Sequence, residues 1–232
     1  MIVRLQRTTS TMKDAAVLAA QGEPHGTAVM AHLQTAGIGR QGHTWHSEDT
    51  GGLYLSIILR LPIASDTMPV LTMALGLAVQ RAVNDIAQAS TDLRWPNDVM
   101  LSERKVAGIL VQAVEGALIA GIGLNVNQIA FPEDLSEIAT SLRIETGREY
   151  AKDSLAERIV AESLRYSSLL VEKGKREILR RFEESSTWPL GKTVEVDGRI
   201  RGVTAGLDVN GFLLVRTSDN LETIIAGGVR AI

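Results

Sequence analysis

The sequence predicts an α+β fold in which a mixed β-sheet packs against helices and a small β-barrel follows at the C-terminal end. Three observations lead to this prediction. Strand-length apolar runs and helical patterns are interspersed through residues 1–187. Residues 188–232 instead contain short strands at regular spacing. The 232 residues are 45% hydrophobic and 22% charged, as in an ordinary globular protein with a sizeable core.

The first half of the larger region alternates between the two patterns. We expect a helix over residues 12–20, strands over 27–33 and 53–61, and a long helix over 66–87. Ser10 or Thr11 can cap the first helix, and Gly22 ends it. The strand at 53–61 is apolar almost throughout, which is typical of a strand covered on both faces. The helix at 66–87 is apolar nearly all round, so it should be buried.

The second half of this region predicts a hairpin and two surface helices. The expected strands are 92–95, 99–101, 106–113 and 117–123, and the expected helices are 154–173 and 175–185. The first of these strands stops at Pro96. Residues 102–105 join two arms of a hairpin. The basic residues between 173 and 181 fit a solvated helix face.

After Trp188 the pattern changes to short strands alone. They are expected at residues 193–196, 200–207, 211–216 and 222–225. Asp197-Gly198 and Asn210-Gly211 supply hairpin turns between them. We therefore expect two domains, residues 1–187 and residues 188–232.

Composition excludes several classes of function. The formal net charge of −3 lacks the basic excess of a general nucleic-acid binder. The chain has no Cys, which excludes disulfide scaffolds, thiolate metal sites and thiol nucleophiles. Its longest apolar stretch, residues 68–79, is shorter than the roughly 20 residues of a membrane span, and the N-terminus has no signal-peptide core. A cytoplasmic protein without a membrane partner is expected.

A glycine-rich stretch follows the strand at 27–33. Gly37-Ile-Gly-Arg-Gln-Gly42 matches the dinucleotide fingerprint in form, but no helix follows it and no acidic residue stands about 20 positions on. Residues 34–45 contain no carboxylate and do contain Arg40, His43 and Trp45. Glycine amides and an Arg fork suit a phosphate, and Trp45 can stack on a base or fill the core. A flexible surface loop is the other interpretation.

Three further clusters favour a ligand site. Arg94-Trp-Pro-Asn-Asp98 places a cation and two polar side chains at the end of a strand, although a plain turn before the hairpin is an alternative. Lys105 enters an apolar strand near Gly108, where its ammonium can meet an anion. Gly121-Ile-Gly-Leu-Asn-Val-Asn127 ends a strand with two Asn side chains able to hydrogen-bond a heteroaromatic base.

Taken in order, these segments resemble a biotin–protein ligase. The resemblance rests on Ser10-Thr11, on Gln34-Thr-Ala-Gly-Ile-Gly-Arg-Gln-Gly-His-Thr-Trp45, on Arg94–Asp98 and on Lys105-Val-Ala-Gly-Ile-Leu110. Each motif is weak alone, but the ordered set is specific and covers nearly the whole chain. The resemblance implies a class II synthetase-like catalytic domain with a C-terminal SH3-like β-barrel.

The resemblance also implies a two-step reaction. Biotin's carboxylate attacks the α-phosphate of ATP, and a lysine of a biotin carboxyl carrier protein domain then attacks the biotinyl-5′-adenylate. The implied biotin-binding residues are Ser10, Thr11, Met12, Gln34, Gly37, Ile38, Gly39, Arg40, Lys105 and Gly108. The implied ATP-binding residues are Arg40, His43, Trp45, Asn97, Lys105 and Asn125, and the implied catalytic residues are Arg40, Lys105 and Asp98. Mg²⁺ would be held mainly by the nucleotide phosphates.

The sequence departs from the family pattern at four positions. Ile38 and His43 stand where the glycine-rich loop usually has arginines, Arg94 replaces a lysine, and Met12 stands where Asn is common. Loss of two cations should weaken nucleotide binding, while biotin binding should persist. A lipoate–protein ligase and a non-catalytic ligand-binding module remain alternatives.

Two expectations concern assembly and DNA. Homodimers are common in the family, and the apolar strand at 53–61 fits either a dimer seam or a buried strand. The chain begins about ten residues before Ser10-Thr11, so we expect a ligase without the DNA-binding domain that some members carry.

Overall fold

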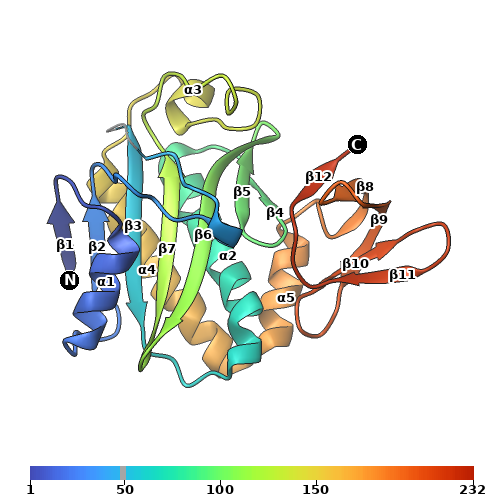
Figure 1. Ribbon diagram of the computed structural model, residues 1–232, viewed down its shortest axis with the longest axis horizontal. Helices are drawn as coiled ribbons and strands as arrows, with labels where there is room; N and C mark the ends of the chain where they lie inside the picture. Colours follow the sequence, from blue (N-terminus) through green and yellow to red (C-terminus); the bar gives the residue numbers. More distant parts are fainter. Residues whose placement is uncertain (48–50) are drawn as a thin grey trace.

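The computed structural model describes residues 1–47 and 51–232, and it confirms the α+β prediction (Figure 1). The larger sheet has the strand order β1-β2-β3-β7-β6-β5-β4. Its strands are β1 (Ile2–Leu5), β2 (Ala28–Ala31), β3 (Gly52–Leu59), β4 (Asp92–Arg94), β5 (Asp98–Leu101), β6 (Arg104–Val114) and β7 (Ala117–Asn125). β1 and β2 are parallel and the other neighbours antiparallel, so the sheet is mixed.

β3 lies in the interior of this sheet, between β2 and β7. All eight of its residues are buried, as the continuous apolar run predicts. An interior strand has both hydrogen-bonding edges occupied and cannot form a seam with a second chain. The dimer-seam interpretation of residues 53–61 is therefore wrong, and the buried-strand interpretation is right.

Helices cover the two faces of the sheet unequally. α2 (Met68–Ala87) and α4 (Lys152–Lys173) pack together behind the sheet in Figure 1, with α5 (Lys175–Glu184) beside α2. On the front, α1 (Thr11–Ala20) contacts β2, β3 and β7. The front of β5 and β6 therefore remains uncovered by a helix, and the loop after β2 crosses it.

The C-terminal part forms a five-stranded antiparallel sheet of order β11-β10-β9-β8-β12, consistent with a small barrel-like domain. Its strands are β8 (Leu190–Val196), β9 (Ile200–Leu207), β10 (Leu213–Arg216), β11 (Leu221–Ile224) and β12 (Val229–Ala231). The expected turn at Asp197-Gly198 forms with positive φ at both residues. The expected boundary at residues 187/188 falls in the connection between α5 and β8.

The two sheets share one hydrophobic core. Trp188 and buried barrel residues such as Val194 and Leu213 belong to the same cluster as Leu71 of α2. The indole Nε1 of Trp95 donates to the carbonyl of Gly211 in the β9–β10 turn at 2.9 Å. These contacts fix the barrel against the sheet edge formed by β4 and β5.

Sequence patterning missed three short elements: β1, β12 and α3 (Leu142–Thr146). None is longer than five residues, which is too short for an apolar period to appear. β1 forms through parallel pairing with β2, a long-range contact that leaves no local signal. Among the described residues, every helix is too short or too polar to cross a bilayer.

Candidate active site

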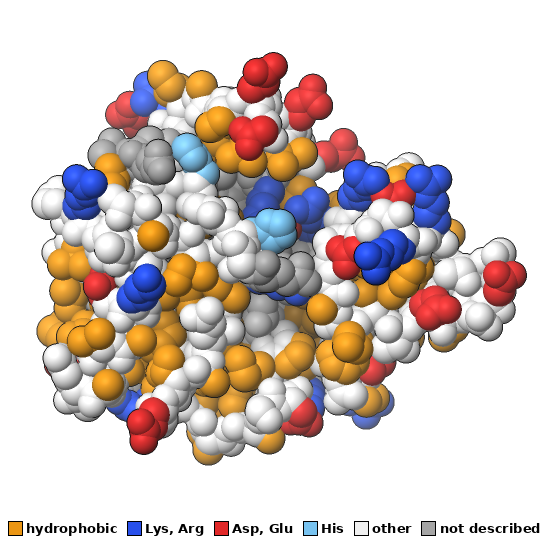
Figure 2. All heavy atoms as spheres, viewed as in Figure 1, with side chains coloured by type: hydrophobic (Ala, Val, Ile, Leu, Met, Phe, Trp, Pro, Cys, Tyr) orange, Lys and Arg blue, Asp and Glu red, His pale blue; other side chains and the backbone are white. Residues whose placement is uncertain are grey.

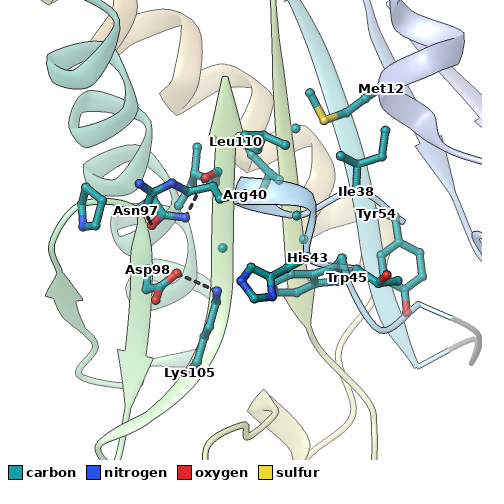
Figure 3. Close-up of a pocket in the computed structure, with 18 of the residues that line it drawn as sticks. Met12, Ile38, Arg40, His43, Trp45, Tyr54, Asn97, Asp98, Lys105 and Leu110 are labelled. Carbon is teal, nitrogen blue, oxygen red and sulfur yellow. Dashed lines mark hydrogen bonds and ion pairs between the residues drawn. The ribbon is translucent and has the colours of Figure 1, made fainter. Parts of the chain in front are cut away.

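A cavity of about 270 Å³ lies on the front of the sheet, where helix cover is missing. Its walls come from the start of α1, the loop over residues 34–45, the middle strands of the sheet and one barrel segment. Figure 2 shows the hollow between the larger part and the barrel, with Lys and Arg side chains inside it and on the adjacent barrel rim. Met12 and Ile38 lie at one end, and Asn97, Asp98 and Lys105 lie at the other (Figure 3).

Two glycines of β7 provide a floor without side chains. A Cβ at Gly121 would lie 2.6 Å from the sulfur of Met12, so this glycine seats Met12. Gly123 pairs with Gly108 of β6, and the indole of Trp45 lies across both. The Gly-x-Gly spacing places both β7 glycines on one face of the strand. Sequence reasoning missed this role, although glycine inside a strand is a known signal for close approach.

The end of the cavity next to α1 is polar but uncharged. Gln34 is 6% exposed, and its Oε1 accepts from the backbone N–H of Thr11 at 2.8 Å and from Thr11 Oγ1 at 3.1 Å. These bonds fix the amide, so the Nε2 group is left as a donor. Ser10 is 1% exposed, and its Oγ has no hydrogen-bond partner among the described residues. A buried hydroxyl of this kind needs a partner, which a polar ligand can supply.

The other end carries a chain of opposite charges. Asp98 lies between two cations: Arg94 Nη2 is 2.6 Å from its Oδ2, and Lys105 Nζ is 2.7 Å from its Oδ1. Burial by itself raises the pKa of Asp98, but the charges of Lys105 and Arg94 outweigh it, so the pKa lies below the usual value of 3.8. Asp98 is therefore a carboxylate at neutral pH, and Lys105 is held at the cavity wall.

Backbone hydrogen bonds and a contact with Trp45 also hold Lys105 in place. Its N–H donates to the carbonyl of Ile138 at 2.8 Å, and its carbonyl accepts from Thr140 at 3.0 Å. Its ammonium lies 5.2 Å from the ring centre of Trp45, within cation–π range. The Lys105 side chain is 29% exposed, so a ligand in the cavity can reach it.

Arg40 approaches the same end from the loop. It lies in a short 3₁₀ turn, Arg40–Gly42, and its Nη1 donates to Asn97 Oδ1 at 2.8 Å. Asn97 Nδ2 in turn donates to the carbonyl of Ile109. Burial lowers the pKa of Arg40, and the carboxylates of Asp98 and Asp197 oppose that shift. Asn97, expected to contact nucleotide or metal, thus serves to anchor Arg40 in this structure.

The loop over residues 34–45 is held in place by contacts among its own residues. Ile38 pairs with Thr44 as an antiparallel bridge, so the loop folds back on itself. A Cβ at Gly37 would meet Trp45 O and Ser47 Oγ at 2.6 Å, and one at Gly39 would meet His43 O at 2.8 Å. These two glycines permit close contacts within the loop, and Gly39 also lines the cavity. Gly37 does not line the cavity, while His43 is exposed at its rim.

Asn125, the last residue of β7, and Asn127, two residues further on, do not line the cavity. Asn125 Nδ2 donates to the carbonyl of Thr140 at 3.0 Å. Asn127 exchanges hydrogen bonds with the backbone of Tyr150 at 2.9 and 3.0 Å. Both side chains are used to fix neighbouring backbone, and neither residue lines the cavity. Their backbone partners lie 15 and 23 residues away, beyond any local pattern.

The barrel contributes a wall that sequence reasoning did not expect. Gly227, Gly228 and Val229 line the cavity, as does Tyr54 of β3. The Gly-Gly pair is visible in the sequence, but nothing local indicates that it lines the same cavity as Arg40 and Asp98, which lie more than 100 residues earlier in the chain. The remaining sequence-predicted residues converge as expected: Ser10, Thr11, Met12, Gln34, Ile38, Gly39, Arg40, His43, Trp45, Asn97, Asp98, Lys105 and Gly108 all line one cavity.

The chain belongs to the biotin/lipoate A/B protein ligase family, whose model matches residues 3–128. Among curated proteins, it is 33% identical over 238 residues to the bifunctional ligase/repressor BirA of Bacillus subtilis, covering 95% of this chain and 71% of that protein. It is 27% identical to the biotin–[acetyl-CoA-carboxylase] ligase of Paracoccus denitrificans, over 97% of this chain and 98% of that one.

Solved structures give the same relationship. The biotin protein ligase of Aquifex aeolicus in complex with biotin and ATP superposes with a TM-score of 0.89 at 31% identity, covering 100% of this chain and 99% of that one. The Leishmania major biotin protein ligase in complex with biotinyl-5-AMP gives a TM-score of 0.70 at 25% identity, over 97% and 98% of the two chains. The fold is therefore that of the biotin protein ligases.

Proposed function

We propose that this chain is an ATP-dependent biotin–protein ligase. It activates biotin as biotinyl-5′-AMP and transfers the biotinyl group to a lysine of a biotin carboxyl carrier protein domain. One observation carries the proposal: a single cavity joins a neutral polar end at Ser10 and Gln34 to a cationic end at Arg40 and Lys105. Biotin has a matching arrangement, with a neutral ureido ring at one end and a carboxylate at the other.

The biotin ring is recognised by residues at the neutral end of the cavity, near the start of α1. The Oγ of Ser10 and the Nε2 of Gln34 offer hydrogen bonds to a ureido group. Met12 and Ile38 supply apolar contact for the rest of the ring and its chain. Neutral groups suit this task, because burying an uncharged ligand against an unpaired charge would cost several kcal/mol.

In the activation step an oxygen of the biotin carboxylate forms a bond to the α-phosphorus of ATP, and the bond to pyrophosphate breaks. Both reactants are anions, so their approach requires positive charge. Lys105 and Arg40 supply it at the cavity wall, and the negative charge that develops on the phosphorus oxygens is stabilised there. Trp45, held flat on Gly108 and Gly123, offers an aromatic surface beside them for the adenine.

In the transfer step the amine nitrogen of the carrier lysine attacks the acyl carbon, the C–N bond forms, the C–O bond to AMP breaks, and the proton lost by the amine passes to water. Asp98 can either orient this lysine or remove its proton. Its two ion pairs and its lowered pKa make it a weak base, so we assign it the orienting role. No protein nucleophile is required, in agreement with a chain that has no Cys.

Magnesium would enter with the nucleotide. The described residues contain no group of three His, Cys, Asp or Glu side chains placed to hold a metal ion. Mg²⁺ is usually held by one or two carboxylates together with phosphates. We assign it to the triphosphate, where it neutralises charge, and we name no protein ligand.

Carrier, location and assembly are part of the proposal. The acceptor is the carrier domain of a biotin-dependent carboxylase, supported by the names of the relatives. The ATP requirement and the absence of Cys fit the cytoplasm. The net charge of −3 gives no support to a DNA-binding role. Homodimerisation stays a prediction, which analytical ultracentrifugation of the purified protein with and without biotinyl-5′-AMP would test.

Transfer of a labelled ligand tests the proposal. Purified protein incubated with ATP, Mg²⁺, radiolabelled biotin and a carrier domain should label the carrier lysine, and a carrier with that lysine changed to Arg should stay unlabelled. A parallel reaction with lipoate and a lipoyl domain addresses the rival within the same family. Labelling by lipoate alone would replace the proposal, and binding of biotin without either product would indicate a non-catalytic module.

A further inference from the structure

The barrel turn between β8 and β9 holds a carboxylate that the proposed reaction does not yet use. We propose that Asp197 is a positioning residue for the activation step: it clamps the barrel segment 227–229 against the cavity and acts as a counter-charge for Arg40. The inference rests on the proposed function. It deepens that function by making one barrel side chain necessary for the nucleotide end of the site.

The clamp consists of a reciprocal pair of hydrogen bonds. The N–H of Asp197 donates to the carbonyl of Gly228 at 3.1 Å, and the N–H of Gly228 donates to Asp197 Oδ1 at 2.6 Å. The fit on the other oxygen is equally close, because a Cβ at Gly227 would lie 2.7 Å from Asp197 Oδ2. The carboxylate therefore packs against two consecutive residues that line the cavity.

Asp197 and Gly227 both have positive φ angles where they meet. Asp197 has φ +47° and Gly227 has φ +142°. Asp tolerates the left-handed region better than most residues, and the Gly227 conformation is essentially confined to glycine. The turn thus aims the Asp197 side chain across the sheet edge instead of back into its own turn.

A second acidic turn in the same barrel shows the difference. Asp208 Oδ1 accepts from the N–H groups of Asn210 and Phe212, two and four residues along the chain, and so stabilises its own turn. Asp197 reaches Gly228, which is 31 residues away and lies on the cavity wall. Gly228 is the next cross-strand neighbour after the Val196–Val229 pair of β8 and β12, so the Asp197 carboxylate extends that pairing onto the cavity wall.

The Asp197 carboxylate also interacts electrostatically with Arg40 at the charged end of the cavity. Arg40 is partly buried, and the carboxylates of Asp98 and Asp197 are the charges that favour its ionised form. Asp98 belongs to β5 and Asp197 to the barrel, so Arg40 lies in the field of one carboxylate from each sheet. Asn97 holds one of its nitrogens, so the Arg40 side chain is fixed in place before a phosphate arrives.

Removing the Asp197 side chain is expected to affect ATP and not biotin. The neutral end of the cavity is built from Ser10, Thr11 and Gln34. The side-chain hydrogen bonds of Thr11 and Gln34 join α1, the loop and Ser56 of β3, and these bonds do not involve the barrel. Loss of the clamp should therefore weaken ATP use and leave biotin binding intact. A residue that only stabilised the fold would affect both ligands together.

Three variants of the full chain test this separation. D197G removes the carboxylate without backbone strain, D197N removes the charge but keeps an oxygen acceptor for Gly228, and D219G removes a charge from the β10–β11 turn of the same barrel as a control. Biotin-dependent pyrophosphate release gives KM and kcat for ATP. Isothermal titration calorimetry without ATP gives the Kd for biotin, and thermal unfolding gives Tm.

We expect D197G to raise the KM for ATP about tenfold, the scale of a lost charged hydrogen bond. D197N should raise it about threefold, because its amide oxygen restores the Gly228 contact, and D219G should match the wild type. The biotin Kd should stay within about twofold in all three, as the neutral end is untouched.

Two results would overturn the inference. One is a KM for ATP in D197G equal to that of D219G. The other is a biotin Kd that rises as much as the KM for ATP, which would make Asp197 a structural residue. Failure of the wild type to release pyrophosphate with biotin would instead reject the proposed function, so the two failures are distinguishable.

Discussion

At one end of the cavity Ser10 and Gln34 present neutral polar groups, whereas at the other end Asp98 joins Lys105 and Arg94 in a chain of charges. The neutral end is almost fully enclosed, with Ser10 1% exposed and Gln34 6% exposed. The charged end opens to the surface, as the 29% exposure of the Lys105 side chain shows. One end of the cavity therefore binds through neutral hydrogen-bonding groups shielded from water, and the other through charged groups open to water.

The difference follows from what each end must do. An enclosed neutral site recognises an uncharged ring by shape and by hydrogen bonds that cannot be replaced by water. An open charged site must admit a nucleotide, stabilise new negative charge and release pyrophosphate, which a fully buried cation would hinder. Substitutions at the charged end should mainly slow the reaction, and substitutions at the neutral end should mainly weaken biotin binding.

The largest effect is expected at Lys105. K105A should slow adenylate formation at least ~100-fold, because it removes a preorganised cation from the oxygens where charge develops. Pyrophosphate release under biotin and ATP saturation measures this rate. K105R is the matched control, since it keeps the charge and should recover part of the rate. Near-normal pyrophosphate release by K105A would contradict the role assigned to this residue.

The Asp98 carboxylate should matter for stability as well as for rate. D98N leaves Lys105 and Arg94 without their shared partner, so we expect a loss of about 3 kcal/mol in the free energy of unfolding at pH 7. Because the folded-state pKa of Asp98 is lowered, its charge stabilises the fold above pH 3.8, and the contribution disappears as the pH falls through the folded-state value. Urea unfolding at pH 7 and pH 3 should show the gap between wild type and D98N shrinking in acid.

A substitution of Ser10 should affect ligand binding and not stability. S10A should weaken biotin binding about tenfold, because the ligand loses a buried hydrogen bond. The free protein should not lose stability, since the Ser10 hydroxyl has no partner among the described residues. Calorimetry with biotin and thermal unfolding without it measure the two quantities. A stability loss equal to the binding loss would mean that Ser10 serves the fold.

The smallest effect is expected at His43. Its side chain is exposed at the rim, so H43Q should raise the KM for ATP no more than about threefold at pH 8. Biotin-dependent pyrophosphate release by the two proteins measures the KM for ATP. Equal KM values for the two proteins would exclude a phosphate contact of His43.

The glycine-rich loop shows how far sequence reasoning extended. The acid-free segment with Arg40 and Trp45 lines the cavity, and its charge and residue types are local properties that the sequence shows. The sequence did not show that Gly37 and Gly39 also permit close contacts within the loop. Which atoms approach a glycine depends on how the chain folds back, and no spacing rule contains that information.

The strands show the same division. Long apolar runs predicted β3, β6, β7 and the mixed sheet, because burial on both faces leaves a continuous hydrophobic signal. The glycine surface under Trp45 required the register that puts Gly108 beside Gly123. Register is set by pairing between distant segments, so it became visible only in the folded chain.

By itself the sequence determined the α+β class, the barrel-forming C-terminal segment, the family, and most of the residues that meet in the cavity. These are set by local periodicity, by turn chemistry and by ordered motifs. The tertiary structure decided that Asn97 holds Arg40 at the cavity wall, that the side chain of Asn125 is used outside the cavity, and that Gly228, which is held by Asp197, lines the site. The reason is physical: a polar side chain bonds whichever partner the fold brings within about 3 Å, and that partner is often far away in the sequence.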